Sequence, residues 1–156
     1  MNSLFADAAI GRKNIGFGLA LFLILGVIVG IPLTVDLFGG SMLTGDHYQA
    51  WKVIHAYGVF LAFVNFFFGH SVDRLNLTRR QKEISSWSFV VAGLFGGIGR
   101  SVLLLLTISG GFGSYAISLI ETAGFLLGTF IFVRGQIKDR TAQLLEQHAT
   151  AVSGTP

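Results

Sequence analysis

Apolar and polar residues are segregated along the chain into long blocks rather than alternating with a short period. Four apolar runs, at about residues 15–35, 53–69, 84–106 and 115–133, are separated by short stretches that carry most of the charged side chains. A helix rises about 1.5 Å per residue, so runs of about 17–23 residues cross a hydrocarbon core of about 30 Å. The pattern predicts an all-α fold, an integral membrane bundle of four transmembrane helices over residues 1–140, followed by a polar C-terminal tail over residues 141–156.

The composition agrees with a membrane protein. Hydrophobic residues make up 52% of the chain and charged residues only 12%, with a mean hydropathy of +0.68, whereas soluble domains carry about 25% charged residues. There is no cysteine, which excludes disulfides and thiolate metal sites. The first run is too long for the apolar core of a signal peptide, so we expect it to be retained as a helix.

Basic residues are distributed unequally between the two ends of the predicted spans. Nine of them fall on one side, namely Arg12 and Lys13 with the Lys and Arg residues of segments 74–82 and 134–140, while Lys52 alone falls on the other. Loops rich in Lys and Arg stay in the cytoplasm, so both termini are expected there. The net charge of +3 therefore reports topology, and no nucleic-acid partner is expected.

Four polar residues lie inside the apolar runs. Helical rise puts His55 roughly 6 Å, Arg100 roughly 12 Å and Glu121 roughly 10 Å from the outer surface, with Asn65 deeper at roughly 21 Å. Ionisable residues at such depth are costly and face the bundle interior or a cavity. Arg100 and Glu121 are therefore expected to face protein or a cofactor, either as a direct ion pair that locks two helices or as a polar pocket for an anionic group such as a propionate.

The imidazole of His55 has two interpretations. It either bonds to a backbone carbonyl or interfacial water, or it binds a metal or haem, as neutral imidazole commonly does. The other histidines, His47, His70 and His148, lie at other depths or outside the spans. Zinc wants three or more protein ligands, but haem needs as few as one axial histidine, which would leave the opposite iron face open.

The segment "WKVIH", which ends at His55, follows a glycine-containing outer loop and opens the second span. With the four spans, the basic cytoplasmic link and a glycine-rich third span, the chain resembles the styrene oxide isomerases, small four-helix membrane enzymes of bacterial styrene degradation. The resemblance implies haem b bound through His55 and a homotrimer with haem near the subunit contacts, in the bacterial inner membrane. Ferric iron would act as a Lewis acid on a small apolar epoxide taken from the bilayer, giving an aldehyde by a 1,2-hydride shift.

The resemblance also implies site residues. The family has an asparagine shortly after the histidine and a tyrosine in the third helix; here Asn65 lies a turn further along, and Arg100 is the polar residue nearest the tyrosine position. Asn65 and Arg100 are thus candidate catalytic residues, and Arg100 and Glu121 candidate cofactor-binding residues beside His55. Two other functions stay open: a non-enzymatic membrane subunit that carries electrons through haem or anchors a larger complex, and a small transporter, which the lack of a detected inverted repeat disfavours.

Overall fold

The computed structural model describes residues 10–40, 42–43, 45–106 and 111–153, and every regular element within these ranges is helical. Two of the helices contain a π-helical segment, and one ends in a turn of 3₁₀-helix. The elements are, in chain order, α1 (Arg12–Leu21), η1 (Phe22–Ile28, π), α2 (Val29–Leu37), α3 (Gly45–Ser71), η2 (Val72–Arg74, 3₁₀), α4 (Arg79–Gly93), η3 (Leu94–Gly99, π), α5 (Arg100–Leu105) and α6 (Phe112–Ser153).

Four continuous helical rods result, since η1 joins α1 to α2 and η3 joins α4 to α5. The stretches Arg12–Leu37, His47–Arg74, Arg79–Leu105 and Phe112–Thr150 are each long and apolar enough to cross a membrane. The predicted all-α fold with four helices of spanning length is thereby confirmed. Each rod exceeds its apolar run because polar residues at the ends are helical too. The second begins at Gly45 rather than Val53.

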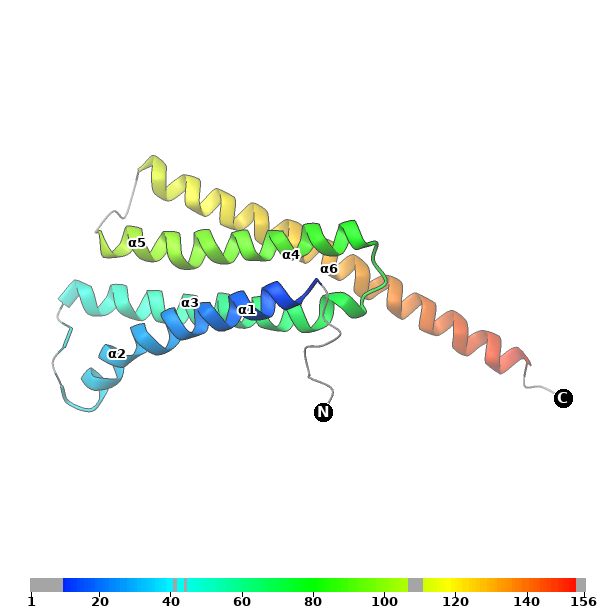
Figure 1. The fold of residues 1–156 in the computed structure, drawn as a ribbon, viewed down its shortest axis with the longest axis horizontal. Helices are drawn as coiled ribbons and strands as arrows, with labels where there is room; N and C mark the ends of the chain where they lie inside the picture. The colour runs from blue at the N-terminus through cyan, green and yellow to red at the C-terminus, as the bar shows by residue number, and fades with distance from the viewer. Residues whose placement is uncertain (1–9, 41, 44, 107–110, 154–156) are drawn as a thin grey trace.

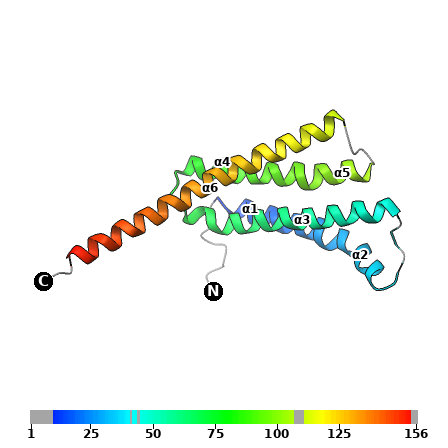
Figure 2. The ribbon, with the colours of Figure 1, turned by 180° about the vertical axis from the view of Figure 1, so that it is seen from behind.

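The rods form two hairpins laid side by side (Figures 1 and 2). In the first, the α1–η1–α2 rod packs on α3; in the second, the α4–η3–α5 rod packs on α6, and α3 joins the two hairpins through α4, η3 and α5. Both hairpins begin at the same end of the bundle (Figure 1). α6 runs past the bundle, and past residue 140 where the predicted polar tail begins, to Ser153.

The link before the fourth rod falls largely on residues 107–110, which lie outside the described residues. The part of the link that is described ends at Gly111, whose φ of +89° favours glycine, and α6 begins at Phe112.

Small residues let the two helices of the first hairpin approach closely. A Cβ at Gly18 would lie 2.7 Å from the carbonyl oxygen of Ala62, and one at Gly58 would lie 2.3 Å from the Cβ of Leu25. Leu25 belongs to a buried cluster with Leu21, Ile54, Leu61 and Ala62. Close backbone approach of this kind is how membrane helices gain packing energy, because lipid provides no hydrophobic drive between them.

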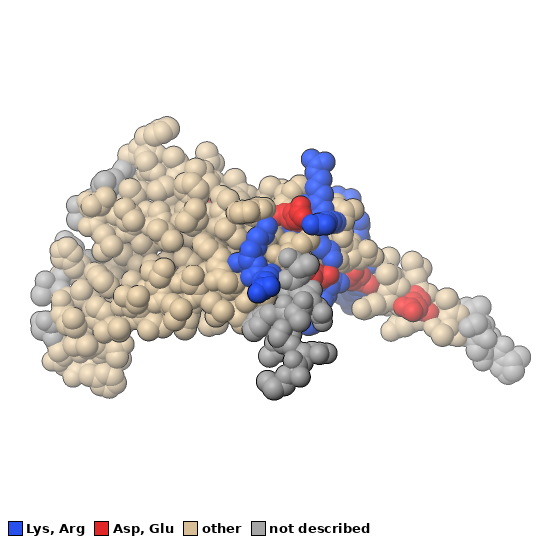
Figure 3. Space-filling model, in the orientation of Figure 1, with Lys and Arg blue, Asp and Glu red and all other residues tan. Residues whose placement is uncertain are grey.

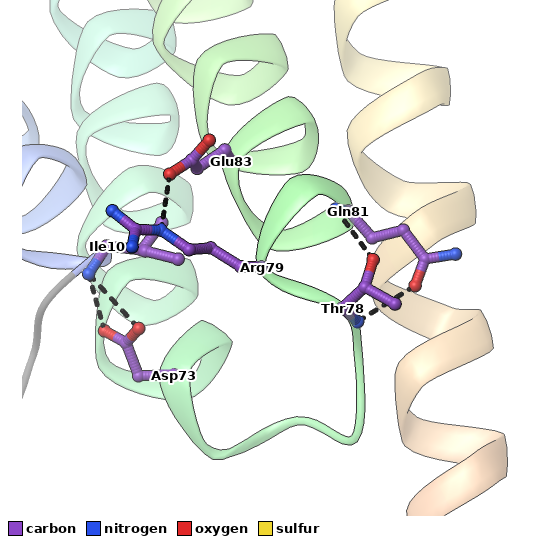
Figure 4. A network of polar contacts seen from close by, with 6 residues as sticks. All are labelled: Ile10, Asp73, Thr78, Arg79, Gln81 and Glu83. Carbon is purple, nitrogen blue, oxygen red and sulfur yellow. Dashed lines mark hydrogen bonds and ion pairs between the residues drawn. The ribbon is translucent and has the colours of Figure 1, made fainter.

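Side chains fix the starts of both hairpins at the charged end. The Asp73 carboxylate accepts hydrogen bonds from the backbone N–H of Ile10, just before α1 (Figure 4). It also accepts one from the backbone N–H of Gly11. Thr78 caps α4 by a capping box with Gln81, which satisfies two otherwise unpaired backbone donors. These contacts fix the backbone where the first rod of each hairpin begins.

Lysine and arginine side chains gather over the end of the bundle where α1 and α4 begin, whereas the surface toward α2 and α5 is uncharged on the face seen in Figure 3. Lys13, near this end, lies 4.3 Å from the ring centre of Trp87. The sequence asymmetry thus becomes a spatial one, with a basic belt at one end of four apolar rods.

Candidate functional site

His55 lies on the face of α3 that packs against the first rod. Its Nδ1 lies 3.2 Å from the carbonyl oxygen of Leu25, within the π-helical segment η1. In this segment backbone bonds run from i to i−5, as from Val29 N–H to the Ile24 carbonyl. Where such a turn returns to α-helix, one carbonyl is left without its usual helical donor, so it is available to a side chain. A bond from His55 to a backbone carbonyl, one of the two interpretations of this residue, is present.

This bond assigns the tautomer of the ring. A carbonyl oxygen only accepts, so Nδ1 of the neutral imidazole carries the proton and Nε2 keeps its lone pair. The ring lines a groove of about 480 Å³ on the side of the bundle. Its lining residues are Gly26, Val27, Gly30, Ile31, Leu33, Thr34, Val35, Leu37 and His55. A Cβ at Gly30 would lie 3.1 Å from Cε1 of His55, so the absence of a side chain there makes room for the ring.

Arg100 and Glu121 pair directly, which is one of the two arrangements that the sequence left open. Arg100 Nη2 lies 2.8 Å from Glu121 Oε2 and donates a second bond to Ser118 Oγ at 3.1 Å. The guanidinium also lies 5.4 Å from the ring centre of Tyr57 on α3. Glu121 packs on Gly96 of η3, where a Cβ would lie 2.5 Å from the carboxyl carbon. The Glu121 side chain is 6% exposed and that of Arg100 38%, while Arg100 Nε is buried without a described partner.

The ion pair and the His55 groove lie on different sides of α3. Tyr57, which faces Arg100, follows His55 by two residues and is therefore about 200° round the helix from it. The described contacts of His55 lead to Leu25 and Gly30 of the first rod. Those of Arg100 lead to α6 and to Tyr57 on another side of α3. Within a single chain, the structure does not bring Arg100 or Glu121 to the imidazole.

Asn65 occupies a separate, fully buried polar cluster. Its Oδ1 accepts from Asn14 Nδ2 at 3.1 Å, and its own Nδ2 donates to the carbonyls of Leu61 and Phe89 at 3.1 and 3.2 Å. Ser86 Oγ donates to Asn14 Oδ1, so the cluster ties α1, α3 and α4 together. Asn65 is ten residues, or about 15 Å, along α3 from His55. Its predicted catalytic role stays a prediction.

The residues Asn14 and Ser86 were missed in the sequence, where they adjoin the basic flanks and look interfacial. They are 0% exposed. A search for polar residues able to pair with Asn65 from the same side of the membrane would have found them, because a buried amide needs partners for its donors and its acceptor.

Within the described residues, no group of three or more His, Cys, Asp or Glu side chains is placed to hold a metal ion. His70, at the other end of α3, bonds through Nδ1 to the Phe66 carbonyl. Comparison of the chain with family models, curated proteins and solved structures found no match. The function is therefore argued from the site itself.

Proposed function

We propose that the protein is a multi-pass membrane haem protein in which His55 supplies the axial ligand through Nε2. The bond from Nδ1–H to the Leu25 carbonyl carries the proposal. Metal-binding histidines usually donate their other ring N–H to a carbonyl or carboxylate, which fixes the tautomer and aims the ligating nitrogen. A ring that merely filled space would not need to line a groove.

The groove suits a haem in three respects. Its volume of about 480 Å³ lies in the usual range for cofactor sites, about 300–1,000 Å³. Gly26 and Gly30 leave its wall without side chains near the ring, and most of the remaining lining is apolar. Porphyrin nitrogens provide the other ligands of the iron, so one histidine is enough and a cluster of protein ligands is not needed.

The proposed activity is isomerisation of a small apolar epoxide to an aldehyde. When bound, ferric haem supplies a Lewis acid for ring opening and the 1,2-hydride shift. His55 holds the cofactor at the groove, and the apolar side chains beside it, such as Val27 and Ile31, exclude the water that would otherwise hydrolyse an opened epoxide. The groove lies on the side of the bundle, so an apolar substrate reaches it from the bilayer.

A non-enzymatic haem subunit of a larger complex is the second candidate. One observation favours it: Asn65 and Arg100, the catalytic candidates, have their described contacts away from the groove. Catalytic use of Arg100 would need a neighbouring chain, which accords with a homo-oligomer such as the trimer implied by the resemblance. The basic belt supports a bacterial inner-membrane location with both termini in the cytoplasm.

The test compares H55A with H70A in detergent-purified protein. H55A is expected to lose the Soret band while keeping its helical circular dichroism, and H70A to retain both, because His70 lies at the opposite end of α3. Retention of haem by H55A would overturn the ligand assignment. Wild-type protein that binds haem but isomerises no aryl or alkyl epoxide would leave the haem subunit as the function.

A further inference from the structure

The two hairpins are alike in sequence as well as in arrangement. Residues 45–74 align without a gap on residues 111–140, at an offset of 66 residues. Nine of the 30 positions are identical: Gly45/Gly111, Ala50/Ala116, Ile54/Ile120, Gly58/Gly124, Leu61/Leu127, Phe66/Phe132, Gly69/Gly135, Asp73/Asp139 and Arg74/Arg140. Apolar identities arise easily in a membrane protein, so tertiary contacts decide whether this likeness is structural.

An aspartate anchors the start of each hairpin in the same way. Asp73 Oδ1 accepts from the backbone N–H of Ile10 at 3.2 Å, as Figure 4 shows, and Asp139 Oδ1 accepts from that of Asn76 at 2.8 Å. Each pair is separated by 63 residues. The alignment that superposes the aspartates therefore superposes their partners, which extends the repeat to the first rod of each hairpin.

A glycine pair gives the second recurring contact. A Cβ at Gly69 would lie 2.7 Å from the carbonyl oxygen of Gly11, and one at Gly135 would lie 2.9 Å from Cδ1 of Leu77. Gly11 and Leu77 are again equivalent at the offset of 66 residues. The second helix of each hairpin thus touches the start of its first rod at one equivalent point.

The third recurring contact is the one that bears on function. Gly30 leaves space for the His55 ring, and its equivalent Gly96 leaves space for the carboxylate of Glu121. His55 and Glu121 are themselves equivalent at the same offset. Each hairpin therefore places one polar side chain of its second helix against a glycine of its first rod, at or beside a π-helical segment.

The two equivalent positions differ in what covers them. Around His55 the wall includes Thr34, a small side chain, and the groove is open. The residue equivalent to Thr34 is Arg100, whose guanidinium bonds to Glu121, and Glu121 is 5% exposed. A long cation stands in one hairpin where a short hydroxyl stands in the other.

We propose that the chain is a parallel tandem repeat of one two-helix unit, residues 10–74 and 76–140, and that the Glu121 site is a closed counterpart of the His55 groove, filled by Arg100. The chain thus keeps one open site, in the first unit. Both hairpins begin at the same end (Figure 1), as parallel repeats require. The identity of the ligand rests on the proposed haem function, but the equivalence of the sites does not.

The test opens the second site by exchanging its residues for those of the first. E121H/R100T is compared with E121H/R100K, which keeps a long cation. Both are produced without haem, so that no iron protects an imidazole, and are treated in detergent with diethyl pyrocarbonate, which modifies accessible neutral imidazoles. Peptide mass spectrometry then gives the modification rate at residue 121, with His55 of the same chain as internal standard. The expected result is a rate close to that of His55 in E121H/R100T and strong protection in E121H/R100K. Equal protection, or equal reactivity, in the two variants would overturn the proposal.

A reciprocal exchange decides the matter if E121H/R100T fails to fold. H55E alone should lower the midpoint of unfolding, because it places a carboxylate in an apolar wall, and T34R/H55E should restore it by forming the ion pair of the second unit. A midpoint for T34R/H55E below that of H55E would overturn the equivalence.

Haem content separates the two proposals. A wild-type chain without haem refutes the proposed function, while the modification rates still decide the repeat.

Discussion

Replacing Glu121 by Gln removes the negative charge of the Arg100–Glu121 pair while keeping the shape of the side chain against Gly96. Two unit charges about 4 Å apart attract by about 4 kcal/mol at an effective dielectric constant of about 20. Glu121 is almost fully enclosed, but the Arg100 side chain is 38% exposed. Solvent therefore screens part of the attraction between the two charges. We therefore expect a coupling of about 2 kcal/mol, toward the upper end for polar contacts between membrane helices.

The assay is a double-mutant cycle of E121Q, R100L and E121Q/R100L, with the free energy of unfolding measured by SDS titration in mixed micelles. Each single variant should be destabilised, because each leaves a polar group without its partner, and the double variant should recover most of the loss. The matched control is the exposed pair Arg79–Glu83, an i,i+4 contact at 3.1 Å with side chains 86% and 45% exposed. Its cycle should give a coupling of about 0.3–0.5 kcal/mol.

Equal couplings in the two cycles would refute the reasoning. Such a result would mean that Arg100 reaches water or lipid headgroups as easily as Arg79 does, and that proximity to Glu121 adds nothing. The closed second site would then have no energetic basis. A larger coupling for Arg100–Glu121, with little change in haem content, is the expected outcome.

Three further predictions concern packing and topology. G96A should destabilise the fold, since its Cβ would lie 2.5 Å from the Glu121 carboxyl carbon, whereas G16A, which meets nothing within 4 Å, should be neutral or stabilising in the same SDS titration. N65A should cost about 1–2 kcal/mol in that titration through three lost interhelical or backbone bonds, with unchanged haem content; loss of haem would instead support a role at the cofactor. Reporter fusions in the link between Arg74 and Arg79 should report a cytoplasmic location, and an external one would reverse the topology.

Hydropathy predicted the number of helices but not their lengths. Hydropathy detects only the apolar residues that face lipid, whereas helical hydrogen bonding continues into the polar residues beyond them. In α6, for example, the helix extends through a polar sequence to Ser153. The same cause moved the start of α3 to Gly45 and so changed the position of His55. It now lies ten residues, or about 15 Å, from the start of its helix.

Similar depth was enough to predict that Arg100 and Glu121 face protein or a cofactor, because ionisable residues inside a membrane seldom face lipid, but it did not decide between a direct ion pair and a pocket for an anionic group. The bond from His55 to the Leu25 carbonyl could not be predicted from the sequence, because it depends on a π-helical segment that has no recognisable residue pattern. The repeat was missed for another reason. Its identities are spread over α3 and α6, and only contacts at equal separation, such as those of Asp73 and Asp139, make them significant.

The contrast between the two equivalent positions argues for His55 as the place where a ligand enters. Inside a membrane a polar atom without a partner is costly, so equivalent polar positions should be satisfied in equivalent ways unless function intervenes. Glu121 has its charge neutralised by Arg100 and its surface covered by Gly96 and its neighbours. His55 has one ring nitrogen bonded to Leu25, and its ring opens on a groove whose wall is otherwise mainly apolar. The groove of the first unit is open where Thr34, a short side chain, stands in place of arginine. The proposed haem iron would bind Nε2 of His55 there and so give this second ring nitrogen a partner.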